Sequence, residues 1–230
     1  MLYEKVPLYR RLPEDLKDQL DGLIQIFLSE KTFFGCGGLE VTDEIKLIIA
    51  AQACILLLNR TTGIYPRLNT IYIYPQSYVV DAKHHDDFLV IEGKDVRVGE
   101  SWQNGPVVLA WDSIANAAEN SEHGHNVVLH EFAHQLDQED GDINGVPMLD
   151  SLSSLETWSE VMENEYEKLR DIVSTRDHAV LDSYGATDPA EFFAVATEAF
   201  FENSWQMQSW CPRLYDEFEK YYKLDPASWK

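Results

Sequence analysis

The sequence predicts an α+β fold in which all 230 residues form one compact domain. Three observations lead to this prediction. Helical hydrophobic patterns occupy residues 1–60 and 154–230, short β-rich runs lie between residues 69 and 109, and a strongly apolar helical segment follows at residues 125–137. The order helices, sheet, helices is typical of the α+β class. We therefore expect an N-terminal helical part (1–60), a sheet with a central helix (69–137) and C-terminal helices (154–230).

The N-terminal part is expected to hold two helices separated by a glycine-rich segment. The first begins at Pro13-Glu14-Asp15, whose acids complement the helix dipole, and runs to about Lys31. The segment Phe33–Gly38 contains three glycines within four residues and predicts a turn or a close backbone approach. The second helix, residues 42–59, is nearly all apolar, so we expect it to be buried on several sides.

The remaining elements follow from periodicity and from turn residues. Short β-rich runs separated by Pro, Gly, Asp and Lys predict strands at residues 70–74, 88–91, 95–98 and 106–109. Helical patterns predict helices at residues 112–120, 125–137, 154–175, 188–203 and 212–222, with a polar loop at 138–147.

Composition narrows the classes of function. A hydrophobic fraction of 45% with 12% aromatic residues excludes a disordered chain. The formal net charge of −22 makes nucleic acid a poor partner, because a phosphate backbone is recognised by basic patches. The same acidity suits a metal cation or the free amino group of a peptide, although plain solubility also explains it.

Cysteine usage and hydropathy bear on the compartment. The three cysteines, Cys36, Cys54 and Cys211, are odd in number and have no metal-ligand spacing, which indicates a reducing compartment. No apolar secretory segment is visible at the N-terminus. The longest apolar stretch, residues 45–58, contains Lys46 and is too short to span a bilayer. We expect a soluble, cytoplasmic protein with no membrane segment.

The central helix carries the H-E-x-x-H motif His130-Glu131-Phe132-Ala133-His134. Histidines at i and i+4 share one helix face and can reach one metal ion, while Glu131 lies beside them as a candidate general base for a metal-activated water. The alternative is a pair of core histidines that bond to carbonyl groups. Asp137, on the same side of the helix, is either a carboxylate partner for a ligand histidine or a solvated acid.

A catalytic zinc site requires a third protein ligand from another element. Asp188-Pro189 is a strong helix start, which places Glu191 in the first turn and Glu198 two turns further along the same face. Spacing favours Glu191 but leaves Glu198 open, and Glu191 could instead act only in a capping box with Asp188. A site of two histidines and a glutamate suits Zn²⁺ better than Ca²⁺ or Mg²⁺.

Other clusters carry weaker signals. Asp140, Asp142 and Asn144 with Gly145 imitate half of an EF-hand loop, but the twelfth position is Ser151, so a polar loop is expected, and whether residues 140–151 bind a second ion is left open. The pair His84-His85, expected in a polar turn, and the residues His123 and His125 are interpreted as surface histidines. There is no serine or cysteine nucleophile signature.

With these residues in view, the chain resembles the Mlc titration factor A family of zinc peptidases. The resemblance covers most of the chain and includes the blocks at residues 34–44, 50–54, 103–109, 126–137 and 186–191. The catalytic core of that family is similar to the metalloprotease domain of anthrax lethal factor. The resemblance therefore implies a zincin-like fold. In such a fold a small twisted mixed sheet packs against the motif helix, with helices flanking both.

The resemblance also implies roles for individual residues. One Zn²⁺ would be held by His130, His134 and Glu191, Glu131 would be the general base, and Tyr184 would assist catalysis. It implies a peptidase of aminopeptidase type that acts on short peptides, and a regulatory role through the glucose repressor Mlc. The alternative is a non-catalytic titration factor that only binds the repressor. From the resemblance to zincins we further expect the strand at residues 106–109 to pair with substrate backbone.

Overall fold

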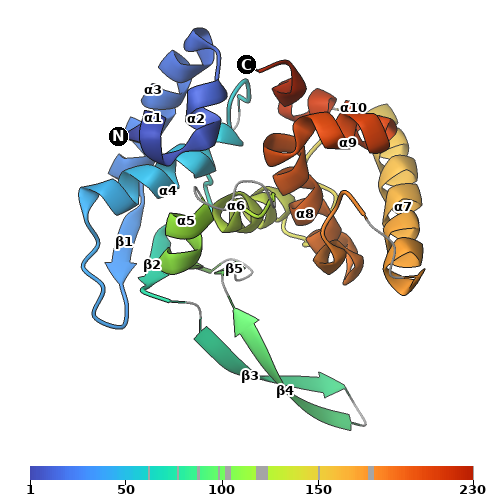
Figure 1. Ribbon diagram of the computed structural model, residues 1–230, viewed down its shortest axis with the longest axis horizontal. Coiled ribbons are helices and arrows are strands. Elements are labelled where there is room, and N and C mark those ends of the chain that lie inside the picture. Colours follow the sequence, from blue (N-terminus) through green and yellow to red (C-terminus); the bar gives the residue numbers. More distant parts are fainter. Residues whose placement is uncertain are drawn as a thin grey trace.

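The computed structural model describes residues 1–61, 63–76, 78–86, 89–97, 99–101, 105–117, 124–149, 151–175 and 179–229. It has a mixed α+β architecture, as the sequence predicts, in which helices outnumber strands among these residues. Figure 1 shows the N-terminal helices on one side, the C-terminal helices on the other and the motif helix between them. Within the described part of the chain, every helix is too short or too polar to cross a bilayer.

The N-terminal part begins with the helices α1 (Leu2–Lys5), α2 (Pro7–Arg11), α3 (Glu14–Glu30) and α4 (Asp43–Ile55). In α3, one face of the helix is buried through Leu16, Leu20, Ile24 and Phe27, at spacings of three and four residues. In α4, Thr42 is the N-cap and accepts a hydrogen bond from the Ile45 N–H, and both faces of the helix are buried. The two short helices α1 and α2 were not predicted.

Four strands form a mixed sheet in the order β1-β2-β6-β5. These strands are β1 (Thr32–Gly35), β2 (Thr70–Tyr74), β5 (Gly99–Ser101) and β6 (Val107–Ala110). The strands β1, β2 and β6 run parallel, with Ile71 opposite both Phe33 and Val107, and β5 is antiparallel to β6. Strand β6 lies inside the sheet between β2 and β5, helix α6 contacts it, and all four of its residues are buried.

Several sequence predictions are wrong in this region. Residues Thr32–Gly35 are strand β1 rather than part of a turn, because their backbone pairs in parallel with β2. The close backbone approach expected there does occur: a Cβ on Gly35 would collide with the carbonyl oxygen of Leu39. Strand β6 cannot offer its edge to a substrate, because β2 and β5 occupy both of its edges.

The expected strands at 88–91 and 95–98 are one strand, β4 (Leu89–Arg97), and Phe88 and Val98 lie outside the described residues. Strand β4 pairs antiparallel with β3 (Tyr78–Asp86), and this pairing continues through residues 92–94, where the sequence predicted a break between two strands. His84 and His85 therefore lie in β3 and not in a turn. In Figure 1 this hairpin extends away from the helices.

The motif helix and the C-terminal helices complete the fold. After α5 (Trp111–Ala117) come α6 (Val127–Asp137), α7 (Leu152–Thr175), the 3₁₀ turn η2 (Ser183–Ala186), α8 (Pro189–Glu202), α9 (Ser204–Trp210), α10 (Pro212–Tyr222) and η3 (Pro226–Ser228). Helix α6 contacts β5 and β6 on one side and packs along α8 on another (Figure 1). Helix α9 was not predicted, because it lies between the two predicted helices at residues 188–203 and 212–222.

One hydrophobic cluster joins these layers among the described residues. It includes Phe27 of α3, Ile49 of α4, Ile71 of β2, Phe132 of α6 and Phe200 of α8, all of them fully or almost fully buried. Phe132 packs against Phe27, with ring centroids 5.7 Å apart, so the apolar side of α6 is fixed between the N-terminal helices and the sheet. The opposite side of α6, with its histidines, therefore turns toward α8.

Candidate metal centre

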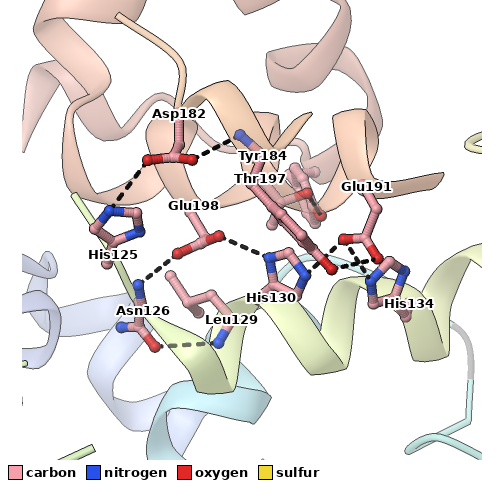
Figure 2. A network of polar contacts seen from close by, with 11 residues as sticks. His125, Asn126, Leu129, His130, His134, Asp182, Tyr184, Glu191, Thr197 and Glu198 are labelled. Carbon is pink, nitrogen blue, oxygen red and sulfur yellow. Dashed lines mark hydrogen bonds and ion pairs between the residues drawn. The ribbon is translucent and has the colours of Figure 1, made fainter. Parts of the chain in front are cut away.

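Helix α6 places both motif histidines on one face. The helix begins after Asn126, whose side-chain Oδ1 accepts a hydrogen bond from the Leu129 N–H at 3.1 Å. His130 and His134 follow one turn apart, and their ring centroids are 4.9 Å apart. Figure 2 shows the two rings side by side, directed toward α8.

Helix α8 brings Glu191 to the same place. Asp188 caps this helix by accepting hydrogen bonds from the N–H groups of Ala190 and Glu191. The Glu191 side chain does not complete a capping box but reaches the histidines. Its Oε2 lies 3.0 Å from Nε2 of His130 and 3.4 Å from Nε2 of His134.

Glu198, the other acid that the sequence left open, lies on the opposite side of the His130 ring. Its Oε1 is 2.8 Å from Nδ1 of His130, whereas Glu191 faces Nε2. The two acids therefore have different positions around one imidazole (Figure 2). Glu198 is placed to fix the orientation and the tautomer of the ring, and Glu191 lies where the ring would meet a metal ion.

Glu198 is held by a buried polar network that sequence analysis did not find. The Asn126 N–H donates to Oε2 of Glu198 at 2.5 Å, and the Asn126 amide donates to Gln52 and to Glu202 at 2.7 Å each. Glu202 also lies 3.8 Å from the guanidinium of Arg11 on α2. The network thus links His130 to α2 and α4, two of the four N-terminal helices. A buried asparagine directly before an apolar helix was its only sequence signal.

Glu131 lies beside the histidine pair as a buried carboxylate. It is 5% exposed, and its Oε2 has no hydrogen-bond partner among the described residues. Burial raises the pKa of Glu131 to about 7, although the nearby charges of His130 and His134 oppose that rise. A carboxyl group with a pKa near neutrality can both accept and return a proton.

Tyr184 reaches the same site from the turn η2. Its hydroxyl donates a hydrogen bond to Oε1 of Glu191 at 3.3 Å, and its side chain is half exposed. The turn is fixed by Asp182, which accepts a hydrogen bond from the Tyr184 N–H at 2.7 Å. Asp182 in turn pairs with His125 at 3.2 Å, just before α6 (Figure 2). This ion pair joins the turn η2, which carries Tyr184, to the segment that precedes helix α6.

The protonation of the group follows from these contacts. Burial opposes the charged form of His130, but hydrogen bonds with Glu191 and Glu198 raise its pKa well above the ordinary value. Burial likewise opposes the charge of Glu191, yet hydrogen bonds from His130 and His134 hold the pKa of Glu191 far below its usual range. Without a metal, the arrangement favours a protonated His130 between two carboxylates.

Asp137 is neither of the two things expected of it. It is fully buried, so it is not a solvated acid, and its hydrogen bond comes from the backbone rather than from a histidine. Oδ2 of Asp137 accepts from the Gly145 N–H at 2.9 Å. Gly145 has φ +77°, and a Cβ there would collide with the carbonyl oxygen of Pro189. Asp137 therefore fixes a loop that packs against the first residue of α8, two residues before Glu191.

The other predicted clusters do not join this group. In the polar loop, Oδ1 of Asp140 and Oδ1 of Asn144 accept hydrogen bonds from nearby backbone N–H groups, which is typical of turns. His123 lies outside the described residues, and His125 pairs with Asp182 at the surface. Among the described residues, the one group of histidine, cysteine or acidic side chains arranged to hold a metal ion is His130, His134 and Glu191.

The donor set fits a zinc ion. Two donors that each lie about 2.0–2.1 Å from one tetrahedral ion are separated by about 3.3 Å. The two separations from Glu191 to the histidines, 3.0 and 3.4 Å, bracket that value, and all three ligand atoms lie within 4.8 Å of one another. Two imidazole nitrogens and one carboxylate oxygen form the set found at catalytic zinc sites with an open fourth position.

Comparisons with known proteins agree with this chemistry. Residues 1–223 match the family described as glucose-regulated metallo-peptidase M90. An uncharacterized protein of Synechocystis is 43% identical over 228 residues, which cover 98% of this chain and 83% of that protein. Mlc titration factor A of Pectobacterium atrosepticum is 32% identical over 97% of this chain and 84% of its own length. The protein of that name from Serratia proteamaculans is also 32% identical, over 97% and 86%.

Proposed function

Because the chain belongs to the family of glucose-regulated M90 metallopeptidases, we propose that it is a zinc-dependent peptidase that hydrolyses peptide bonds. The observation that carries the proposal is the convergence of His130, His134 and Glu191, with the buried carboxylate of Glu131 beside them. His130, His134 and Glu191 would be the metal ligands. When bound, zinc polarises a scissile carbonyl group and lowers the pKa of a water molecule.

The chain's own residues would then move the protons. Glu131 would accept a proton from the attacking water as the water oxygen bonds to the carbonyl carbon. It would then pass that proton to the leaving amine as the carbon–nitrogen bond breaks. Its pKa, raised by burial to about 7, supports this role. The Tyr184 hydroxyl, which now donates to Glu191, would donate to the oxygen that gains negative charge. Glu198 would hold His130 in the ligand orientation.

The proposal is tested by replacing Glu131 with Gln, which keeps the shape of the side chain and removes its charge. We expect peptide turnover to fall by about 10²–10⁴-fold, while bound zinc stays at one ion per chain. The matched control is Glu217→Gln, which alters another buried glutamate away from the metal centre. This control should keep full turnover. If Glu131→Gln retained wild-type turnover with zinc bound, the assignment of the general base would be wrong.

The contribution of Tyr184 is measured separately. Tyr184→Phe keeps the ring and removes the donor, so we expect a loss of about 10²–10³-fold in kcat, the range found for one oxyanion donor. Peptides with free and with blocked N-termini should be compared in the same assay. Faster cleavage of free N-termini would support an aminopeptidase-type activity, which the resemblance implies and which suits the acidic surroundings of the site.

A second candidate function comes from the names of the relatives at 32% identity, Mlc titration factor A. This chain could bind the transcription repressor Mlc, with or without hydrolysis. The same Glu131→Gln variant separates the two functions, because it should stop hydrolysis and leave repressor binding intact. Both functions fit a cytoplasmic location, which the free thiols of Cys36, Cys54 and Cys211 support.

A further inference from the structure

A cavity lies away from the metal centre. Its volume is about 430 Å³, within the range of small-molecule sites. It is bounded by the first turns of α7, by α10 and by the segment that follows α4, and none of the metal-site residues lines it. Helices α7 and α10, which supply much of the lining, contact each other on the C-terminal side of the molecule (Figure 1).

The charge of this cavity is opposite to that of the protein. The whole chain has 18 basic and 40 acidic residues. Of the charged residues that line the cavity, three are basic, Arg60, Lys220 and Lys223, and one is acidic, Glu217. With Glu139, which pairs with Arg60, counted as well, three basic and two acidic groups leave a small positive excess in a chain of net charge −22, and this excess favours an anion over a cation.

The basic groups differ in what they can offer. Arg60 is fixed in the wall: its Nη2 lies 3.0 Å from Oε2 of Glu139, and its Nη1 bonds to the Tyr221 hydroxyl. Lys220 lies at the rim with 68% of its side chain exposed, and its Nζ is 2.6 Å from Oε1 of Glu217. An ammonium group has three N–H donors, so this single contact leaves Lys220 able to bind a ligand as well.

The start of α7 adds polar groups to the wall of the cavity. The Thr157 hydroxyl donates to the Ser153 carbonyl, and the Ser151 hydroxyl contacts those of Ser153 and Ser154, so an anion would compete with these local contacts. Ser153, Ser154 and Thr157 line the cavity. They lie in the first two turns of a helix of 24 residues, whose N-terminal amides and dipole favour negative charge. The floor is apolar, because Trp158 and Tyr221 are both buried there, with ring centroids 5.5 Å apart. The site thus combines a polar, basic rim with an aromatic floor.

We propose that this cavity binds a small organic anion, a carboxylate or phosphate group on a short carbon skeleton. The anionic group would lie between Lys220, Lys223 and the first turns of α7, and the carbon skeleton would contact Trp158 and Leu149. The site is separate from the metal centre, and the proposal stands independently of the peptidase function.

The test is calorimetric titration of the full-length, zinc-loaded protein with two probes, glycerol 3-phosphate and succinate, at constant ionic strength. We expect saturable binding of at least one probe. Lys220→Glu should weaken it at least tenfold, because the variant replaces a donor by a like charge. Binding of glycerol 3-phosphate alone would identify a phosphate site, and binding of succinate alone a carboxylate site.

Lys168→Glu is the matched control. Lys168 forms the same i,i+3 contact on α7, 2.6 Å from Glu165, with 65% of its side chain exposed, but it does not line the cavity. This variant should bind the probes as the wild type does. The proposal is overturned if neither probe binds, if Lys220→Glu binds as well as the wild type, or if both variants lose affinity equally, which would indicate a general effect of charge.

Discussion

The hydrogen bond between Glu198 and His130 leads to a quantitative prediction about metal affinity. Oε1 of Glu198 is 2.8 Å from Nδ1 of His130, and the two side chains are 8% and 13% exposed, so solvent screens their interaction only weakly. The carboxylate fixes the ring with Nε2 toward Glu191 and makes that nitrogen a stronger donor to a metal. Glu198→Gln keeps an acceptor oxygen in nearly the same place and removes the charge.

The expected loss is about 10–100-fold in zinc affinity, which corresponds to about 1.4–2.7 kcal/mol. Competition against a chromogenic chelator of known zinc affinity measures it directly, without reference to hydrolysis. Thermal unfolding of the zinc-loaded variant verifies that the fold is kept. Turnover at saturating zinc should recover most of the wild-type value, because Glu198 acts through His130 and not on the substrate.

Glu202→Gln is the matched control for this experiment. Glu202 is one turn further along α8, and its side chain is only 11% exposed. It accepts a hydrogen bond from the side-chain amide of Asn126, whose backbone N–H donates to Glu198, but among the described contacts no hydrogen bond joins Glu202 to His130. Its zinc affinity should stay close to that of the wild type, because Glu202 does not bond to a ligand histidine. A wild-type affinity in Glu198→Gln, or an equal loss in Glu202→Gln, would refute a specific effect on His130.

Three further predictions concern stability. Burial raises the pKa of Glu131 to about 7 in the folded protein, above its unfolded value, so the stability from its protonated form is complete below about pH 4.5 and is lost as the pH rises through 7. Gln cannot lose this proton. In denaturant unfolding of the metal-free proteins, the free energy of unfolding of Glu131→Gln relative to the wild type should therefore rise by on the order of 3 kcal/mol between pH 4.5 and pH 8. Gly145→Ala adds a collision with α8 to the strain of a positive φ, whereas Gly38→Ala adds the strain alone. The first variant should therefore lose at least about 1 kcal/mol more of the free energy of unfolding than the second, and only the first should also weaken zinc binding. His125→Gln removes an exposed ion pair with Asp182, so it should lower the free energy of unfolding by under about 1 kcal/mol near pH 6 and leave it unchanged at pH 9. The pair exists only at pH values between the lowered pKa of Asp182 and the raised pKa of His125. Equal losses of stability at both pH values would contradict this.

The helices could be predicted from the sequence because each buries a face that the 3.6-residue period reveals. Helix α3 repeats Leu16, Leu20, Ile24 and Phe27, and α10 was predicted with its observed ends. Strand β1 could not be predicted in the same way, because three of its four residues are exposed and show no alternation. Its existence depends on backbone pairing with β2, about forty residues further along the chain, which no local pattern encodes.

The candidate site divides along the same line. The spacing of His130 and His134 is a property of one helix, so the sequence could state which face the rings share. The partner acid comes from another helix, and there spacing narrowed the choice to two residues but could not decide. Glu191 and Glu198 are seven residues apart and face the same helix, so only their positions along it determine that one meets Nε2 and the other Nδ1 of His130.

The charges around this site would give a bound metal a structural role besides the proposed chemical one. Four largely buried carboxylates belong to this region. Glu191 and Glu198 contact the imidazole rings, Glu131 lies beside the rings, and Glu202 is joined to Glu198 through Asn126. Apart from the histidines, the one cation that the described residues pair with any of them is Arg11, at 3.8 Å from Glu202. Buried carboxylates without counter-charge favour protonation, as the raised pKa values of Glu131 and Glu202 indicate. A divalent cation bound by His130, His134 and Glu191 would offset two of these negative charges. It would therefore stabilise the folded protein, in addition to the catalytic role that the sequence predicts.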